Sequence, residues 1–209
     1  YKAKAIVVAC NTAAAALPVH ELEAELAADG LHIPVIGVID PGAQSLVRAT
    51  RSGTVGVIGT IGTIGSGAYD LAVSRASLGA PVKLVGAACP GFVEFVERGV
   101  TSGPALMAVA EEYLAPIKAA GVDTLVLGCT HYPLLTGAIS YVMGDNVTLV
   151  SSAEETAKDV YRTLVAHDLL RTSDQTPTLR FQATGDATSF GKLARRFLGP
   201  EVASVEQLG

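Results

Sequence analysis

The 209-residue sequence carries little charge, and its cations are scattered. Charged residues make up 17% of the chain, and its 15 Lys and Arg residues form no long run. A surface that binds nucleic-acid phosphates needs clustered cations, and a formal net charge of −5 disfavours binding to a polyanion. We therefore expect no nucleic-acid partner.

Long apolar runs are also missing. No stretch approaches the roughly 18 residues of a membrane span, and the start of the chain does not resemble a signal peptide. Hydrophobic residues nevertheless account for 49% of the sequence, which is enough to build a sizeable core. We expect a folded protein with no membrane partner.

Cysteine is scarce. The three cysteines, Cys10, Cys89 and Cys129, are odd in number and have no Cys-x-x-Cys spacing. This pattern is typical of reduced thiols in the cytoplasm rather than of a disulfide framework. Zinc bound by Cys10, Cys129 and His131 is an alternative, but the usual ligand spacings are missing and no metal is expected. The Gly-rich stretch 59–67 lacks both the GxGxxG pattern and a P-loop lysine, which disfavours a phosphate site.

What the sequence does contain is two similar strand ends that each deliver a cysteine. Residues 124–127 form a short apolar run typical of a buried parallel strand, and Gly128 then allows a close turn before Cys129, Thr130 and His131. Near the start, the run 5–9 is followed in the same way by Cys10, Asn11 and Thr12. Reactive groups of open α/β sheets lie where a strand ends and a helix begins, so both places are candidate sites.

Apolar strands alternate with helices along the chain. We expect a helix over 13–28, a strand over 54–59, a loop over 60–66 and a helix over 187–198. Such alternation with short connections predicts an α/β fold with doubly wound, mostly parallel sheets.

The two cysteine-bearing strands indicate a duplication. They lie 119 residues apart (129 − 10), and AIVVACNT and TLVLGCTH share apolar residues at their three middle strand positions. We predict two similar lobes related by a pseudo-twofold axis, with the active site in the cleft between them. The first would comprise residues 1–33 and 150–209, and the second residues 34–149. The first lobe is expected to be incomplete at its N-terminus, because a strand as apolar as 5–9 usually has neighbours on both sides.

Paired thiols suit a particular chemistry. A thiol has a pKa near roughly 8.5, close enough to neutrality to donate or accept a proton. Two thiols on opposite sides of one carbon could remove a proton from one face and return one to the other. That inverts a stereocentre without a cofactor. Asn11, Thr12 and Thr130 could bind a carboxylate or ammonium group beside the cysteines, and His131 could orient or titrate against a thiol.

Several motifs together resemble the glutamate racemases of the aspartate/glutamate racemase family. They are VVACNTA, GTIGTIGSGAY, ACPGFVEFVERG, LVLGCTHYPLL, SSAEETA and TGDATSFGKLA, in the family's order from about residue 2 to 199. The resemblance implies a cytoplasmic, cofactor-independent enzyme that interconverts L- and D-glutamate and supplies D-glutamate for bacterial peptidoglycan.

The resemblance also implies roles for individual residues. Cys10 and Cys129 would be the acid/base pair, with His131 and Glu97 supporting them. The substrate contacts would be Asn11, Thr12, Thr60, Thr63, Thr130 and His131. Family members begin with an Asp-Ser-Gly loop and a Pro-Tyr-Gly motif that this sequence lacks, so an inactive truncated form is one alternative.

Other interpretations stay open at this point. Each cysteine could be a small core residue, which is the favoured interpretation for Cys89. His131 could be structural, Glu97 could be an exposed helix-end acid, and Thr60 and Thr63 could cap the next helix. Aspartate racemase is the nearest alternative activity. A homodimer and an interaction with DNA gyrase are further partner alternatives.

Overall fold

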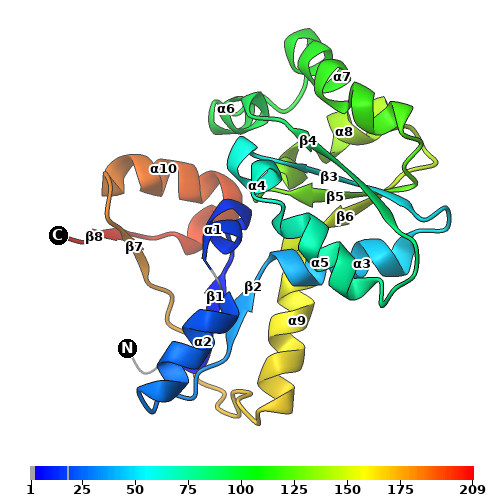
Figure 1. The fold of residues 1–209 in the computed structure, drawn as a ribbon. Coiled ribbons are helices and arrows are strands. Elements are labelled where there is room, and N and C mark those ends of the chain that lie inside the picture. The colour runs from blue at the N-terminus through cyan, green and yellow to red at the C-terminus, as the bar shows by residue number, and fades with distance from the viewer. Residues whose placement is uncertain (1–2, 18) are drawn as a thin grey trace. The chain divides into compact units, whose positions relative to one another are not determined.

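A computed structural model describes residues 3–17 and 19–209 (Figure 1). The chain divides into two compact units, Tyr1–Leu170 and Arg171–Gly209. The first unit contains β1 (Ile6–Val8), α1 (Asn11–Ala16), α2 (Val19–Ala28), β2 (Val35–Gly37), α3 (Ile39–Ala49), β3 (Thr54–Gly59), α4 (Ile61–Gly65), α5 (Ala68–Ala76), β4 (Lys83–Ala88), α6 (Gly91–Glu97), α7 (Pro104–Ala119), β5 (Thr124–Gly128), a 3-10 helix (Tyr132–Leu135), α8 (Thr136–Met143), β6 (Thr148–Ser151) and α9 (Ser152–Ala166). The second unit contains β7 (Phe181–Ala183), α10 (Ala187–Leu198), a 3-10 helix (Gly199–Glu201) and β8 (Val205–Gln207).

All strand pairs among the described residues are parallel, which confirms the predicted α/β class. The main sheet has the order β4-β3-β5-β6, while β1 pairs with β2 and β7 pairs with β8. In the main sheet the chain first moves from β3 outward to β4 and then crosses to β5 on the other side of β3. The strand order therefore reverses between β3 and β5, and helices cover both faces of the sheet (Figure 1).

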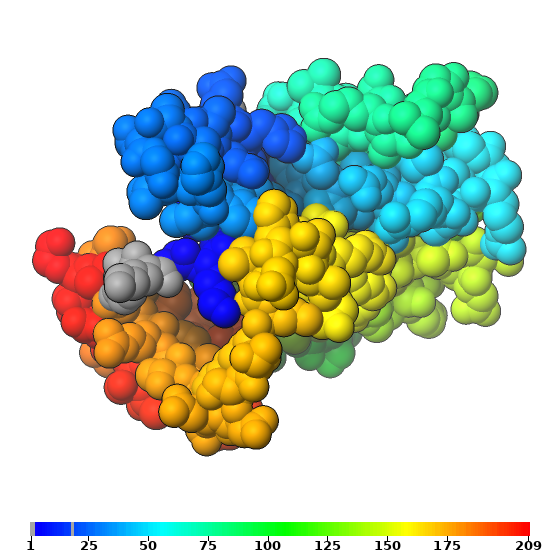
Figure 2. Space-filling model, turned by 90° about the horizontal axis from the view of Figure 1, so that it is seen from below, coloured from blue at the N-terminus to red at the C-terminus, as the bar shows by residue number. Residues whose placement is uncertain are grey.

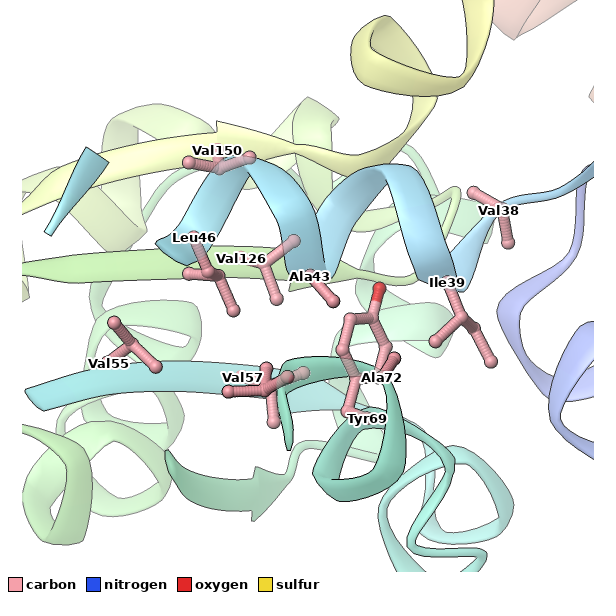
Figure 3. Close-up of a cluster of buried hydrophobic side chains, with 11 residues drawn as sticks. Val38, Ile39, Ala43, Leu46, Val55, Val57, Tyr69, Ala72, Val126 and Val150 are labelled. Atoms are coloured by element: carbon pink, nitrogen blue, oxygen red, sulfur yellow. The ribbon is translucent and has the colours of Figure 1, made fainter. Parts of the chain in front are cut away.

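The alternation of side chains along the strands builds a core on each face of the main sheet. On one face, Val126 of β5 packs with Val55 and Val57 of β3 under α3 and α5, where Leu46 and Tyr69 are almost fully buried (Figure 3). On the other face, α7 supplies four buried side chains, Leu106, Ala110, Leu114 and Ile117. β5 is buried along its whole length, as its apolar sequence predicts.

Two predicted elements differ from the structure. The single helix expected over 13–28 is two helices, α1 and α2, because Leu17 is extended with φ −101° and ψ 121°. A residue before a proline avoids the helical conformation, and residue 18 itself lies outside the described residues. The expected loop over 60–66 is wrong as well, since it contains the short helix α4, which Thr60 caps by accepting a hydrogen bond from the Thr63 N–H.

The predicted division into lobes at residues 34 and 150 stays a prediction. β2, which that division assigns to the second lobe, pairs with β1 of the first, in the register Ile6 with Val35. Helix α9 follows β6 directly and, with only Ser152 and Thr156 buried, is exposed along much of its length on the face shown in Figure 2. Within residues 3–17 and 19–209, the helices lack the combination of length and hydrophobicity that a membrane span requires.

Asp123 joins the end of α3 to the start of β5. Its carboxylate accepts hydrogen bonds from the Thr50 hydroxyl at 2.7 Å and from the backbone N–H groups of Arg51 and Ser52 at 2.7 and 2.6 Å. Partial burial alone would raise the pKa of Asp123. The hydrogen bonds from Thr50, Ser52 and Arg51 outweigh burial and hold the pKa well below its ordinary value of 3.8.

We expect Asp123→Asn to lower the free energy of unfolding by about 2–3 kcal/mol, because several charge-assisted hydrogen bonds are lost. A carboxylate with a depressed folded-state pKa stabilises the fold fully above its unfolded-state pKa, and this contribution disappears as the pH falls through the folded-state pKa. Urea unfolding from pH 7 down to about 2 should therefore show the difference between variant and parent shrinking below about pH 4. Asp145→Asn, at an exposed turn, is the matched control. Equal losses in both variants would contradict the prediction.

Candidate active site

The ends of β3 and β5 meet at the point where the strand order of the main sheet reverses. In open α/β sheets, ligands bind beyond the carboxyl ends of the strands at such a point. β3 ends at Gly59, directly before Thr60, and β5 ends at Gly128, directly before Cys129. A Cβ atom at Gly128 would lie 2.8 Å from the Ile58 carbonyl oxygen, so only glycine allows β3 and β5 this close approach. The topology thus places Cys129 beyond the carboxyl end of β5, where ligands bind in open α/β sheets.

Cys129 lies in a largely buried position, with 7% of its surface exposed. Burial is the main effect that raises the pKa of the Cys129 thiol, and the backbone N–H of His131 lowers it to a smaller extent. A charge on Cys10 would raise it further. Burial therefore favours the neutral thiol at Cys129.

His131 connects Cys129 to a carboxylate. Its Nδ1 lies 3.8 Å from the Cys129 sulfur and 3.5 Å from the Thr130 hydroxyl, and its Nε2 lies 3.2 Å from a carboxylate oxygen of Glu97. Glu97 is the last residue of α6, so this helix brings the acid to the turn after β5. The structure therefore gathers four of the predicted site residues, Glu97, Cys129, Thr130 and His131.

Three threonine hydroxyls form a second cluster. Thr12 of α1 lies 2.8 Å from Thr60 and 3.1 Å from Thr63, and Thr60 and Thr63 are 3.1 Å apart, oxygen to oxygen. Thr63 is buried, whereas Thr12 is exposed. The cluster ties the turn after Cys10 to the turn after β3 and offers hydroxyl groups for a polar ligand.

Cys10 and Asn11 are neighbours in sequence but have different surroundings. Cys10 is exposed at the start of α1, whereas Asn11 is only 2% exposed. The Asn11 amide bonds to two buried hydroxyl groups, those of Tyr69 and Ser152. Neither hydroxyl was a predicted site residue, although Tyr69 ends the motif GTIGTIGSGAY and Ser152 lies in SSAEETA.

Cys89 does not belong to either cluster of candidate site residues. It is completely buried at the end of β4, where burial and then the charge of Cys129 raise the pKa of its thiol to about 12. Its sulfur contacts the Ala87 carbonyl at 3.7 Å. These surroundings are those of a core residue. In the part of the chain that the structure describes, no three His, Cys, Asp or Glu residues gather as metal ligands.

The three thiols should therefore react with iodoacetamide in a fixed order. We expect Cys10 to be alkylated first and Cys129 more slowly, because Cys129 is buried and holds less thiolate at neutral pH. The rate at Cys129 should keep rising with pH above the ordinary thiol pKa, and Cys89 should react only on unfolding. Mass spectrometry of the digested protein at timed intervals measures all three. Labelling of Cys89 in the folded protein as fast as that of Cys10 would contradict this order.

Comparison with known proteins gives one consistent result. Residues 1–160 match the Asp/Glu/Hydantoin racemase family. A glutamate racemase of Beutenbergia cavernae is 57% identical over 97% of this chain and 70% of its own length. Among solved structures, a glutamate racemase of Bacillus anthracis has a TM-score of 0.88 at 41% identity, covering 99% of this chain and 74% of its own. The glutamate racemase of Francisella tularensis in complex with D-glutamate has a TM-score of 0.86 at 34% identity, covering 100% and 74%. The chain belongs to the Asp/Glu/Hydantoin racemase family.

Proposed function

We propose that this protein interconverts L- and D-glutamate, with Cys10 and Cys129 as the two acid/base groups. The observation that supports it most directly is that the end of β5 brings Cys129 together with His131 and Glu97. The hydroxyls of Thr12, Thr60 and Thr63 join the start of α1, directly after Cys10, to the end of β3. Its relatives at more than half identity are glutamate racemases, and one related structure holds D-glutamate. This disfavours the alternative of an aspartate racemase.

The proposed reaction needs one thiolate and one thiol. The thiolate takes the α-proton of glutamate, so that the C–H bond breaks and its electron pair stays on the substrate. The other thiol then gives its proton to the opposite face of the α-carbon. After one turnover the two cysteines have exchanged protonation states, and the next substrate enantiomer or exchange with water restores them. The two thiols alone balance these proton transfers.

The other site residues fit supporting parts in this reaction. Hydrogen-bond donors near the substrate must stabilise the carbanionic transition state. We assign this part to the clustered hydroxyls of Thr12, Thr60 and Thr63, which would bind a carboxylate of the substrate. His131, held by Glu97, is within reach of Cys129 and could adjust the position of its proton. Asn11 and Thr130 remain proposed substrate contacts.

We propose the cellular compartment and the use of the product on chemical grounds. Three free thiols suit the reducing cytoplasm. D-Glutamate made there would serve the synthesis of peptidoglycan. A homodimer and an interaction with DNA gyrase stay predictions.

Deuterium exchange tests the proposal. The purified protein is incubated with L-glutamate in deuterated water without pyridoxal phosphate. Optical rotation follows racemisation, and mass spectrometry follows deuterium at the α-carbon. We expect the rotation to fall to zero as the α-deuterium approaches completion. If glutamate neither exchanges nor racemises and aspartate does, the proposed substrate is wrong. If neither substrate reacts, either with this chain or with one lengthened by the Asp-Ser-Gly and Pro-Tyr-Gly segments of the family, the two-thiol proposal is wrong.

A further inference from the structure

A chain of buried hydrogen bonds lies behind the two cysteines. The Tyr69 hydroxyl donates to Asn11 Oδ1 at 2.8 Å, Asn11 Nδ2 donates to Ser152 Oγ at 3.3 Å, and the Ser152 hydroxyl donates to the Leu127 carbonyl at 2.9 Å. All three side chains are 2% exposed. We refer to Tyr69, Asn11 and Ser152 as the buried relay.

The direction of the relay is fixed by its end. The Leu127 carbonyl can only accept, so Ser152 must donate to it and its own oxygen must accept from the Asn11 amide nitrogen. This sets the orientation of the Asn11 amide and leaves Oδ1 to accept from Tyr69. Burial raises the pKa of Tyr69 far above its ordinary value, so its hydroxyl keeps its proton at any working pH. Tyr69 also interacts with the Ser152 side chain, so the three side chains hold one another in place.

The relay joins the two strand ends that deliver the cysteines. Asn11 is the first residue of α1 and the neighbour of Cys10, while Leu127 lies in β5 two residues before Cys129. Ser152 begins α9 and Tyr69 lies in α5, so two further elements brace the connection. The Tyr69 hydroxyl points from the core cluster toward the start of α3 in Figure 3.

The fit around the relay is close. A Cβ atom at Gly42 of α3 would lie 3.2 Å from the Tyr69 hydroxyl oxygen and 3.6 Å from Cβ of Ser152. A Cβ atom at Gly128 would lie 3.3 Å from the Tyr69 ring. Glycine at both places leaves room for the relay.

We propose that Tyr69 and Ser152 are positioning residues for the racemisation, which hold Asn11 and thereby set where Cys10 stands relative to Cys129. The inference rests on the proposed function for its catalytic part. Proton transfer at both faces of one carbon needs both sulfurs at the right distance, and a displacement of about 1 Å can cost as much as 100-fold in rate. A relay that fixes one strand end against the other supplies that alignment.

Tyr69→Phe and Ser152→Ala test the inference, since each removes one oxygen from the relay. Tyr113→Phe is the matched control, because the Tyr113 hydroxyl also accepts a hydrogen bond, from the Gly91 N–H at 3.3 Å, but is not part of the relay. The first measurement is backbone hydrogen exchange of residues 10–17, which does not depend on activity. We expect it to become faster in Tyr69→Phe and Ser152→Ala and to stay unchanged in Tyr113→Phe.

The second measurement separates positioning from mere stability. When glutamate reacts in deuterated water, the cysteine that removed the α-proton can exchange it for a deuteron from the solvent and deuterate the carbanion on the same face, which returns the original enantiomer with deuterium. Reprotonation by the other cysteine inverts it. With Cys10 displaced, the ratio of exchange without inversion to inversion should rise about tenfold, and kcat should fall by a similar factor with little change in KM. A variant that only lost stability would keep the parent's ratio.

The outcomes are distinct. An unchanged ratio and unchanged hydrogen exchange in folded Tyr69→Phe and Ser152→Ala would overturn the inference. If the unsubstituted protein exchanges no α-proton of glutamate, the proposed function fails, and hydrogen exchange still decides whether the relay holds α1. If one variant does not fold, the other carries the test, because both act on the same relay.

Discussion

Cys10→Ser and Cys129→Ser should each lower the rate of glutamate racemisation by about 10³-fold or more, because a serine hydroxyl is far too weak an acid to replace a thiol near neutral pH. The two variants should differ in the glutamate enantiomer whose α-proton they still exchange. In each of them the remaining cysteine can still take a proton from one face of the α-carbon, exchange it with the solvent and return a solvent-derived proton to the same face. Cys10→Ser should therefore exchange the α-proton of one glutamate enantiomer, and Cys129→Ser that of the other.

The measurement is deuterium incorporation into L- and D-glutamate, tested separately with each variant. Cys89→Ser is the control, since Cys89 is fully buried and its thiol has no part in the proposed transfer. We expect Cys89→Ser to keep the parent's rate per folded molecule. Full racemase activity in either Cys10→Ser or Cys129→Ser would refute the two-base proposal.

Phe92→Ala should have the largest effect on stability, a loss of about 3–5 kcal/mol in the free energy of unfolding. Phe92 is completely buried in α6, and its ring makes edge contacts with Tyr113 at 5.5 Å and Tyr132 at 5.4 Å between centroids. Removing the ring deletes both contacts and leaves a cavity that the close-packed surroundings can fill only in part. Denaturant unfolding followed by circular dichroism measures the loss.

The control for Phe92→Ala is Tyr141→Ala. Tyr141 is 79% exposed on α8, so its replacement should change the free energy of unfolding by about 0.5 kcal/mol or less. Phe92 contacts Tyr132, which follows His131 directly. The folded fraction of Phe92→Ala should therefore also show a changed alkylation rate at Cys129. Similar losses in the two alanine variants would show that the aromatic cluster contributes little.

Much of the fold could be predicted from local pattern. The strand over 54–59 and the helix over 187–198 agree with the structure residue for residue, since each has a continuous pattern between clear stop signals. The break at Leu17 and the helix within 60–66 were not predicted. The break depends on the proline at position 18, and the short helix depends on its cap, Thr60. A prediction from the average composition of a stretch gives such single residues too little weight.

The candidate site was predictable in part. Cys10 and Cys129 could be singled out because each follows an apolar strand and precedes polar residues, whereas Cys89 follows a strand too but is a core residue. Tyr69 and Ser152 cannot be found in this way, since an aromatic residue in a helix and a serine before one are ordinary core and capping residues. Only the tertiary structure shows that they meet Asn11. The pairing of β1 with β2 is likewise a property of the folded sheet rather than of either strand.

Strand β5 has a structural anchor at one end and reactive chemistry at the other. Asp123 precedes the strand and Cys129 follows it, roughly 20 Å apart at the usual rise per residue. At that distance, substitutions at the two ends should act independently. The amino end of the sheet is therefore a place where the stability of the fold can be changed by design or by natural variation while the candidate site around Cys129 is left intact.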